Sequence, residues 1–142
     1  MWLIFKVNPC YFLKKYNLII FLLFTLLIIA CRNSKSTIIV KSTSPHITYT
    51  GRIDTTQNQG TKLYWSGTSI KINFEGTSIS ASLKDTKGDN YYNIIVDGNL
   101  HSILQPDTTQ QYYPLIRSLS KGIHTIEIYK RTEWDRGTTT FY

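Results

Sequence analysis

Residues 63–83 read LYWSGTSIKINFEGTSISASL, and this stretch decides the fold class. A short polar connection, Glu75-Gly76-Thr77, separates two runs in which every second side chain is apolar. Such period-two alternation, interrupted by a turn that contains glycine, predicts an antiparallel β-hairpin with one buried face. The apolar positions are Ile70, Ile72 and Phe74 in the first run, and Ile79, Ala81 and Leu83 in the second.

The rest of the chain after residue 45 continues as short strands and turns. Asp97-Gly98 is a tight-turn dipeptide, and Pro114 favours an edge or a bulge in its strand. Turns every ~8–12 residues, without any lasting helical spacing, predict an all-β fold, an antiparallel two-sheet jelly-roll sandwich. The expected strands cover residues 46–53, 60–65, 68–74, 77–84, 91–96, 100–104, 112–119, 123–130 and 138–142. Because the chain stops at Tyr142 within the closing strands, truncation at the last strand is one alternative.

An uncharged apolar run, LIIFLLFTLLIIA, covers residues 18–30 near the amino terminus. Three lysines precede it, and the first acidic residue is Asp54. A cationic leader followed by an apolar segment of ~7–15 residues predicts a secretory signal peptide, here a signal helix within residues 1–30. The run is shorter than the ~20 residues that a bilayer span needs.

The four residues Leu27-Ile28-Ile29-Ala30 stand directly before Cys31, an order that resembles a bacterial lipobox. The resemblance implies cleavage before Cys31, a diacylglycerol on its sulfur and an acyl chain on the new amino terminus. One acyl chain alone binds a membrane only marginally, so several chains matter. We therefore expect a membrane-anchored lipoprotein of the bacterial cell envelope, on the periplasmic side or at the cell surface. A retained transmembrane helix with an incidental cysteine is the alternative.

The mature chain would run from Cys31 to Tyr142, which is enough for one small domain. It would carry 13 basic and 9 acidic side chains, and a net charge of +4 gives no reason to expect nucleic acid as a partner. Cys31 would be its only cysteine, so no disulfide framework or thiolate metal site is available. Residues 31–45, rich in serine, threonine and lysine, predict a flexible tether, with a short strand at 38–40 as the alternative. The folded domain is expected over residues 46–142.

A series of short motifs, in a defined order, resembles a known accessory domain. The order resembles the amino-terminal jelly-roll domain of family two carbohydrate esterases, of the acetylxylan esterase type, over about residues 46–142. The motifs are Tyr49-Thr50-Gly51-Arg52-Ile53-Asp54, Trp65-Ser66-Gly67-Thr68-Ser69-Ile70, Phe74-Glu75-Gly76-Thr77, Tyr92-Asn93, Val96-Asp97-Gly98, Gly122-Ile123-His124-Thr125 and Lys130-Arg131-Thr132-Glu133.

In that family the jelly roll is followed by an SGNH hydrolase domain, which carries the nucleophilic serine and its histidine and deacetylates plant-type polysaccharides. The resemblance implies an accessory domain that packs against such a hydrolase domain, while the chain itself contains none. Whether the chain counts as an enzyme therefore stays open, and we expect it to be inactive alone. The alternatives are an independent carbohydrate-binding lipoprotein and an inert structural lipoprotein domain.

Catalytic and metal-binding patterns are weak in this sequence. The glycine-serine-glycine elbow of serine hydrolases is absent. Gly88-Asp89-Asn90 is similar to the Gly-Asp-Ser block of SGNH enzymes, but asparagine replaces serine, so a hairpin loop is the simpler explanation. His46, His101 and His124 fall on different expected strands without metal-ligand spacing. We predict no catalytic residue, no metal and no cofactor.

Aromatic residues are the remaining candidates for a site. Flat aromatic faces stack on sugar rings, and they also pack between domains. Tyr64, Trp65, Tyr112 and Trp134 are the candidates for carbohydrate binding or domain docking, and packing in a core or interface is the favoured interpretation. Arg52 and Asp54 flank Ile53 on one strand, so a surface ion pair between them is expected.

Overall fold

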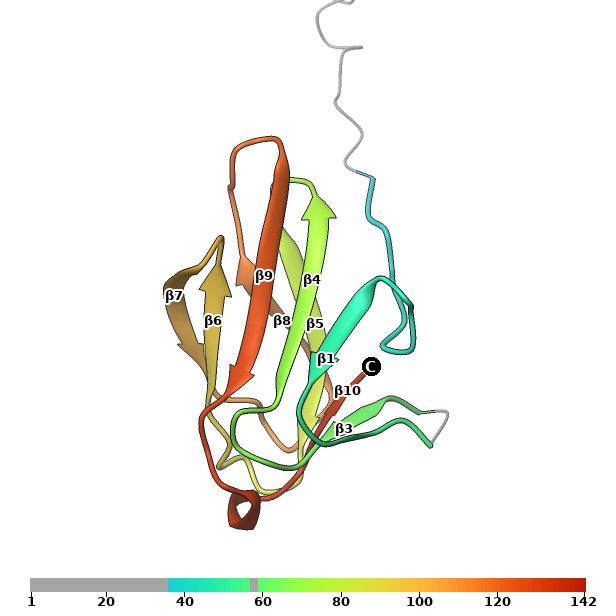
Figure 1. The fold of residues 1–142 in the computed structure, drawn as a ribbon, viewed down its shortest axis with the longest axis vertical. Helices are drawn as coiled ribbons and strands as arrows, with labels where there is room; N and C mark the ends of the chain where they lie inside the picture. Colours follow the sequence, from blue (N-terminus) through green and yellow to red (C-terminus); the bar gives the residue numbers. More distant parts are fainter. Residues whose placement is uncertain (1–35, 57–58) are drawn as a thin grey trace, which may run out of the picture. The chain divides into compact units, whose positions relative to one another are not determined.

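The computed structural model describes residues 36–56 and 59–142, and Ile39–Tyr142 form one compact unit. Two antiparallel five-stranded sheets face each other in this unit (Figure 1). The first sheet contains, in spatial order, β1 (Ile47–Thr50), β4 (Ser69–Glu75), β9 (Ile123–Lys130), β6 (Tyr92–Val96) and β7 (Asn99–Leu104). The second sheet contains β2 (Ile53–Asp54), β3 (Thr61–Leu63), β10 (Thr139–Phe141), β5 (Ile79–Asp85) and β8 (Gln111–Ile116). The expected two-sheet antiparallel sandwich is confirmed.

The hairpin predicted within residues 63–83 is wrong. β4 pairs with β1 and β9, whereas β5 pairs with β10 and β8, so the two strands belong to opposite sheets. The connection at Gly76 is an arch between the sheets, and the Gly76 N–H donates to the Gly122 carbonyl (3.1 Å) of the neighbouring arch. The reason is physical: alternation shows that one face of each strand is buried, but both an arch and a hairpin satisfy that condition.

The buried faces that the alternation predicts are nevertheless correct. Ile70 from β4 and Leu83 from β5 are completely buried between the sheets. Ile126 and Ile128 of β9 continue the same core, and Ile72 and Phe74 pack against it partly buried. Burial of one such aliphatic side chain contributes about 1.5–3 kcal/mol to stability.

The first expected strand, residues 46–53, is divided at Gly51. β1 lies in the first sheet and β2 in the second, so the chain changes sheets between them. Gly51 has a φ of 94°, and a Cβ there would lie 3.0 Å from the Thr68 Cα. Only glycine adopts this backbone at low cost, which explains the break. The other expected strands agree with the observed ones to within a few residues at each end.

The amino-terminal expectations fall mostly outside the described residues. The signal peptide, Cys31 and the first part of the tether lie within residues 1–35. Residues 38–40 form no strand, so that alternative is wrong, and Ser42 is buried beside β1. Among residues 36–56 and 59–142, no helix is long and apolar enough to cross a membrane.

The carboxyl-terminal strand, β10, is an inner strand of its sheet. It pairs with β3 on one side and with β5 on the other, and the Tyr142 N–H donates to the Ser82 carbonyl (3.1 Å). The first part of β5, Ile79–Ala81, pairs with β8 on one side and with no other strand among the described residues. Truncation of the sandwich at its last strand stays a prediction.

Candidate binding site at the loop end of the sandwich

Three connections meet at one end of the sandwich, which we call the loop end: residues 64–68, 86–91 and 131–138. Figure 1 shows the short 3-10 turn η1 (Trp134–Arg136) at this end, at the bottom of the view. Backbone hydrogen bonds join the connections to one another. The pairs are Gly67 N–H to Lys130 carbonyl (2.9 Å), Thr86 N–H to Thr138 carbonyl (3.0 Å) and Arg131 N–H to Tyr91 carbonyl (2.9 Å).

Two exposed tryptophans lie side by side at the loop end. The ring centroids of Trp65 and Trp134 are 6.2 Å apart with an interplanar angle of 39°, and we call these residues the tryptophan pair. Trp65 is 41% exposed and Trp134 is 62% exposed. The Arg52 guanidinium carbon lies 5.6 Å from the centroid of the Trp65 ring, which is a cation–π distance. Neither tryptophan is part of the buried core, so of the favoured interpretation, packing in a core or interface, only the interface stays a prediction for this pair.

A buried lysine fastens the two connections that carry the tryptophan pair. Lys130 is completely buried at the end of β9, and its Nζ donates to the carbonyls of Tyr64 (2.8 Å), Thr132 (3.2 Å) and Glu133 (3.3 Å). Burial lowers the pKa of this ammonium, and the carboxylates around it, Asp85 first, act in the opposite direction. Three accepting carbonyls match the three N–H donors of an ammonium group.

A buried aspartate fixes the third connection. Asp85 is completely buried at the end of β5, and its Oδ1 accepts from the backbone N–H groups of Lys87 (2.9 Å) and Gly88 (2.7 Å). Its Oδ2 accepts from the Asn90 amide (2.7 Å) and from the Thr139 hydroxyl. All four donors are protein groups, so both carboxylate oxygens have hydrogen-bond partners within the fold.

Asn90 extends this network to the connection that carries Trp134. Its Oδ1 accepts from the Thr132 hydroxyl (2.6 Å), and its amide also lies 3.4 Å from the Arg136 carbonyl. Gly88-Asp89-Asn90 is thus a structural loop around Asp85, but the hairpin-loop interpretation is wrong, because β5 and β6 belong to opposite sheets and do not pair.

Polar groups border the tryptophan pair. The Ser66 hydroxyl donates to Glu133 Oε2 (3.0 Å), which bridges the two connections on their solvent side. The Lys87 ammonium donates to the Asp135 carbonyl (2.8 Å) within the same end of the fold. A ligand that lies on the exposed rings would therefore meet both donors and acceptors.

The four aromatic candidates from the sequence do not form one group. Trp65 and Trp134 come together, but Tyr64 supplies its backbone carbonyl to Lys130. Tyr112, 73% exposed, lies on the edge strand β8 opposite Ser82, apart from the aromatic contacts of the loop end. Their role in binding carbohydrate or a second domain stays a prediction.

The ion pair expected between Arg52 and Asp54 is wrong. Arg52 stacks on Trp65, whereas Asp54 accepts from the N–H (2.9 Å) and the hydroxyl (2.6 Å) of Thr56. These two bonds are the main reason why the pKa of the Asp54 carboxyl is lowered. Gly51 breaks the strand, so the regular alternation assumed for residues 52 and 54 does not hold.

Lys130, Asp85 and Asn90 were not anticipated from the sequence as members of a site. The sequence does contain a pattern that could have identified Lys130 and Asp85. Lys130 follows Ile126 and Ile128 in the inward register of β9, and Asp85 follows Leu83 in that of β5. A charge in an inward register needs a buried partner, so two such charges indicate a polar network inside the sandwich.

Acid–base chemistry finds little support in the described part of the chain. His124 Nδ1 lies 2.8 Å from Asp97 Oδ2, and its Nε2 lies 3.0 Å from the Ser120 carbonyl. Both ring nitrogens face acceptors, which raises the pKa of His124, with the Asp97 hydrogen bond as the main cause. Both ring nitrogens of His124 are thus engaged within the fold, and neither is free to take a proton from a serine hydroxyl. In residues 36–56 and 59–142, no group of three His, Cys, Asp or Glu side chains is placed to hold a metal ion.

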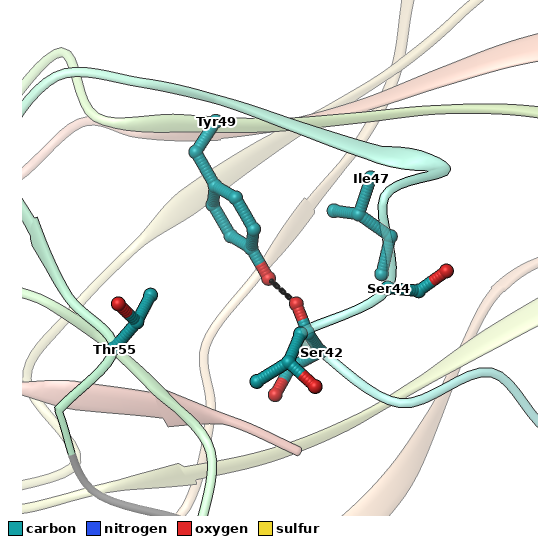
Figure 2. A pocket seen from close by; sticks show the side chains of 6 residues that line it. Ser42, Ser44, Ile47, Tyr49 and Thr55 are labelled. Carbon is teal, nitrogen blue, oxygen red and sulfur yellow. Dashed lines mark hydrogen bonds between the residues drawn. The ribbon is translucent and has the colours of Figure 1, made fainter.

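A shallow pocket of about 330 Å³ lies beside β1 (Figure 2). Figure 2 shows the Tyr49 hydroxyl pointing to the Ser42 carbonyl, to which it donates (2.6 Å). Burial raises the pKa of Tyr49, so this pocket offers hydroxyl groups without a base near neutral pH. The lining residues are Ser42, Thr43, Ser44, Ile47, Tyr49 and Thr55.

Comparison with known proteins places these features in a family. Residues 49–142 match the family described as Carbohydrate esterase 2 N-terminal. The chain is 36% identical over 98 residues to the cellulase/esterase CelE of Acetivibrio thermocellus, which covers 69% of this chain and 12% of the relative. It is 25% identical over 115 residues to the acetylxylan esterase/glucomannan deacetylase of Cellvibrio japonicus, which covers 78% of this chain and 32% of the relative.

A solved structure shows the same likeness. The family two carbohydrate esterase of Clostridium thermocellum, in complex with cellohexaose, superposes with a TM-score of 0.64 at 36% identity. The match covers 67% of this chain and 29% of that chain. The chain thus spans about a third or less of the length of each of these relatives.

Proposed function

Because the chain belongs to the N-terminal domain family of family 2 carbohydrate esterases, we propose that it is the accessory β-sandwich of a lipid-anchored carbohydrate acetylesterase. In this role it packs against an SGNH hydrolase domain, which performs polysaccharide deacetylation. One observation carries the proposal: the family match covers residues 49–142, while this part makes up only 12% and 32% of the two curated relatives.

The chemistry of the described residues supports a division of labour. Both ring nitrogens of His124 face acceptors within the fold, and His124 lies at the end of the sandwich opposite the exposed tryptophans. A sandwich built in this way supports and helps to shape the esterase domain. The serine and histidine that cleave the ester belong to that partner domain. The substrates that we propose are acetylated plant polysaccharides, because the Cellvibrio relative is named for acetylxylan and glucomannan.

The outer face of the first sheet offers apolar area for this packing. Ile103 and Tyr129 lie on either side of Asn93 in one cross-strand row, and they are 54% and 38% exposed. Leu100, 62% exposed, lies opposite Ile95 in the next row. Several exposed apolar residues on one sheet face are typical of surfaces that contact another protein domain.

Capture of the native protein tests the proposal. An antibody against the sandwich would be used to isolate the protein and its companions from detergent-solubilised cell envelopes. We expect the captured material to release acetate from acetylated xylan or glucomannan, and the purified full chain alone to release none. Captured material without acetate release would contradict the proposal.

The lipid anchor has its own test. Growth with an alkyne-tagged palmitate should label the full chain, and Cys31→Ala should remove the label and release the protein from the membrane fraction. A Cys10→Ala variant is the matched control and should stay labelled, since Cys10 lies in the predicted signal peptide. Equal labelling of Cys31→Ala would contradict anchoring at this residue.

An independent carbohydrate-binding lipoprotein is the second candidate. The exposed tryptophan pair favours it, since it provides a binding surface that needs no second domain. Capture of the sandwich alone, together with retained glycan binding, would favour this candidate over the accessory role.

A further inference from the structure

We infer that the tryptophan pair, together with Arg52 and Glu133, forms a glycan-binding site on the sandwich itself. Its ligand class is a neutral β-linked polysaccharide whose pyranose rings present a flat C–H face. The inference deepens the proposed function and rests on it only for the choice of plant polysaccharides as probes.

The aromatic surface supplies the stacking part of such a site. The flat C–H face of a pyranose with equatorial substituents lies well against an indole ring, since both surfaces are apolar and rigid. Arg52 lies over Trp65, so Trp134, which is 62% exposed, offers the freer ring face. Trp65 then supports Trp134 from the side at a centroid distance of 6.2 Å.

The charged groups beside the rings supply the polar part. Glu133 uses Oε2 to accept from Ser66, which leaves Oε1 to accept from a sugar hydroxyl. The Arg52 guanidinium carries five N–H donors in a plane. A sugar hydroxyl is both a donor and an acceptor, so one acidic and one basic neighbour match it better than two groups of equal charge.

The buried network holds this surface in one conformation. Lys130 binds the carbonyls of Tyr64 and Glu133, the residues directly before Trp65 and Trp134. Asp85 and Asn90 fix the neighbouring connection and, through Thr132, the start of the Trp134 segment. Groups that are held before the ligand arrives lose little conformational entropy on binding, so a small surface can still bind usefully.

The same surface is a poor match for domain packing. Protein interfaces have cores depleted of charged residues, whereas Arg52 lies over Trp65, and Glu133 and Asp135 directly flank Trp134 in the chain. The row of Ile103 and Tyr129 on the outer sheet face fits a protein partner better. We therefore assign glycan to the tryptophan pair and treat domain docking there as an outcome of the test.

Affinity electrophoresis of the detergent-purified full chain tests this assignment. Native gels would contain soluble xylan, glucomannan or no polysaccharide. We expect retardation with at least one polysaccharide and a loss of at least about tenfold in affinity for Trp134→Ala, which corresponds to about 1.4 kcal/mol. Ile123→Ala, which removes an exposed apolar side chain at the opposite end of β9, is the control and should bind like the unmodified chain. Melting temperatures would confirm that both variants are folded.

The outcomes separate this inference from the proposed function. Absence of retardation in both polysaccharide gels, or equal retardation of Trp134→Ala, would overturn the glycan site. If Trp134→Ala instead keeps glycan binding but no longer captures acetate-releasing material, the pair docks a domain and only this inference fails. If glycan binding depends on Trp134 but the captured native protein releases no acetate, only the proposed function fails.

Discussion

The two ends of the sandwich each use one aspartate to fasten their connections, and they differ in burial. At the loop end, Asp85 is completely buried and accepts from four protein donors. At the opposite end, Asp97 follows β6, and its side chain is 47% exposed. It accepts from the Thr125 N–H (2.8 Å) and contacts His124 (2.8 Å).

The difference in burial predicts which end of the sandwich is rigid and which end is sensitive to pH. A hydrogen bond inside the protein is stronger than in water, and a donor left without a partner there is costly. An exposed pair exchanges its partners with water at little cost. We therefore expect the loop end to be a rigid support for the tryptophan pair and the opposite end to respond to pH.

The largest expected effect is that of Asp85→Ala. The change leaves two buried donors, on Asn90 and Thr139, and two partly buried backbone N–H groups without an acceptor. It also removes the carboxylate that acts most strongly on Lys130, so we expect a loss of about 3–5 kcal/mol in the free energy of unfolding. Urea unfolding of the full chain, followed by circular dichroism, measures it. Asp97→Ala, at the exposed end, should lower the free energy of unfolding much less. Equal losses for the two variants would contradict the comparison.

Lys130→Met is expected to have the next largest effect. Methionine fills the space but gives no donor to the three carbonyls, so we expect a loss of about 2–4 kcal/mol. Lys71→Met is the matched control, because Lys71 is half-exposed and forms a surface ion pair with Glu127 (3.4 Å) worth less than about 1 kcal/mol. A Lys130 variant as stable as the control would show that the buried ammonium does not fasten the loop end.

The pH dependence of stability sharpens the comparison at the exposed end. The pKa of His124 is raised by its hydrogen bond to Asp97, so its contribution is complete below the ordinary value of 6.5 and is lost as pH rises through the raised value. The pKa of Asp97 is lowered, mainly by the Thr125 N–H, so its contribution is present above 3.8 and is lost as the pH falls through the lowered value.

Melting temperatures between pH 4 and pH 8 measure this effect. The difference between the unmodified chain and His124→Gln should be largest from about pH 4 to pH 6.5 and should shrink at higher pH. His101→Gln, at an exposed position on the edge strand β7, is the control and should show no such window. A His124 difference that does not change across this range would contradict the assignment.

The smallest expected effect on stability is that of Trp134→Ala. The ring is mostly exposed and caps no buried group, so we expect a change within about 0.5 kcal/mol. The same urea experiment measures it. A loss of unfolding free energy as large as that of Lys130→Met would show that the Trp134 ring stabilises the loop end itself and is not only an exposed surface on it.

Strands and their buried faces were predictable because they depend on local alternation. Ile70 and Leu83 are buried as the alternation predicts, and the Asp97-Gly98 turn joins β6 and β7 as expected, with Asp97 at a φ of 49° and Gly98 at 80°. The arch at Gly76 was not predictable, because sheet membership depends on pairing with β9, about fifty residues later in the chain. Local sequence carries no record of that distant partner.

The candidate site shows the same limit. Trp65 and Trp134 were recognisable as aromatic residues in polar surroundings, but their contact depends on two connections that the Lys130 ammonium joins. Arg52 was assigned to an ion pair because regular alternation was assumed across Gly51, and the glycine breaks that alternation.

By itself, the sequence determined the all-β class, the positions of the strands, their buried faces and the family resemblance, since these depend on side-chain order and spacing. Only the tertiary structure decided which strands share a sheet and which exposed aromatic residues meet. It also showed that an inward lysine and an inward aspartate hold the loop end together. Those features arise from contacts between residues far apart in the chain, where burial makes a charge costly until the fold itself supplies its partners.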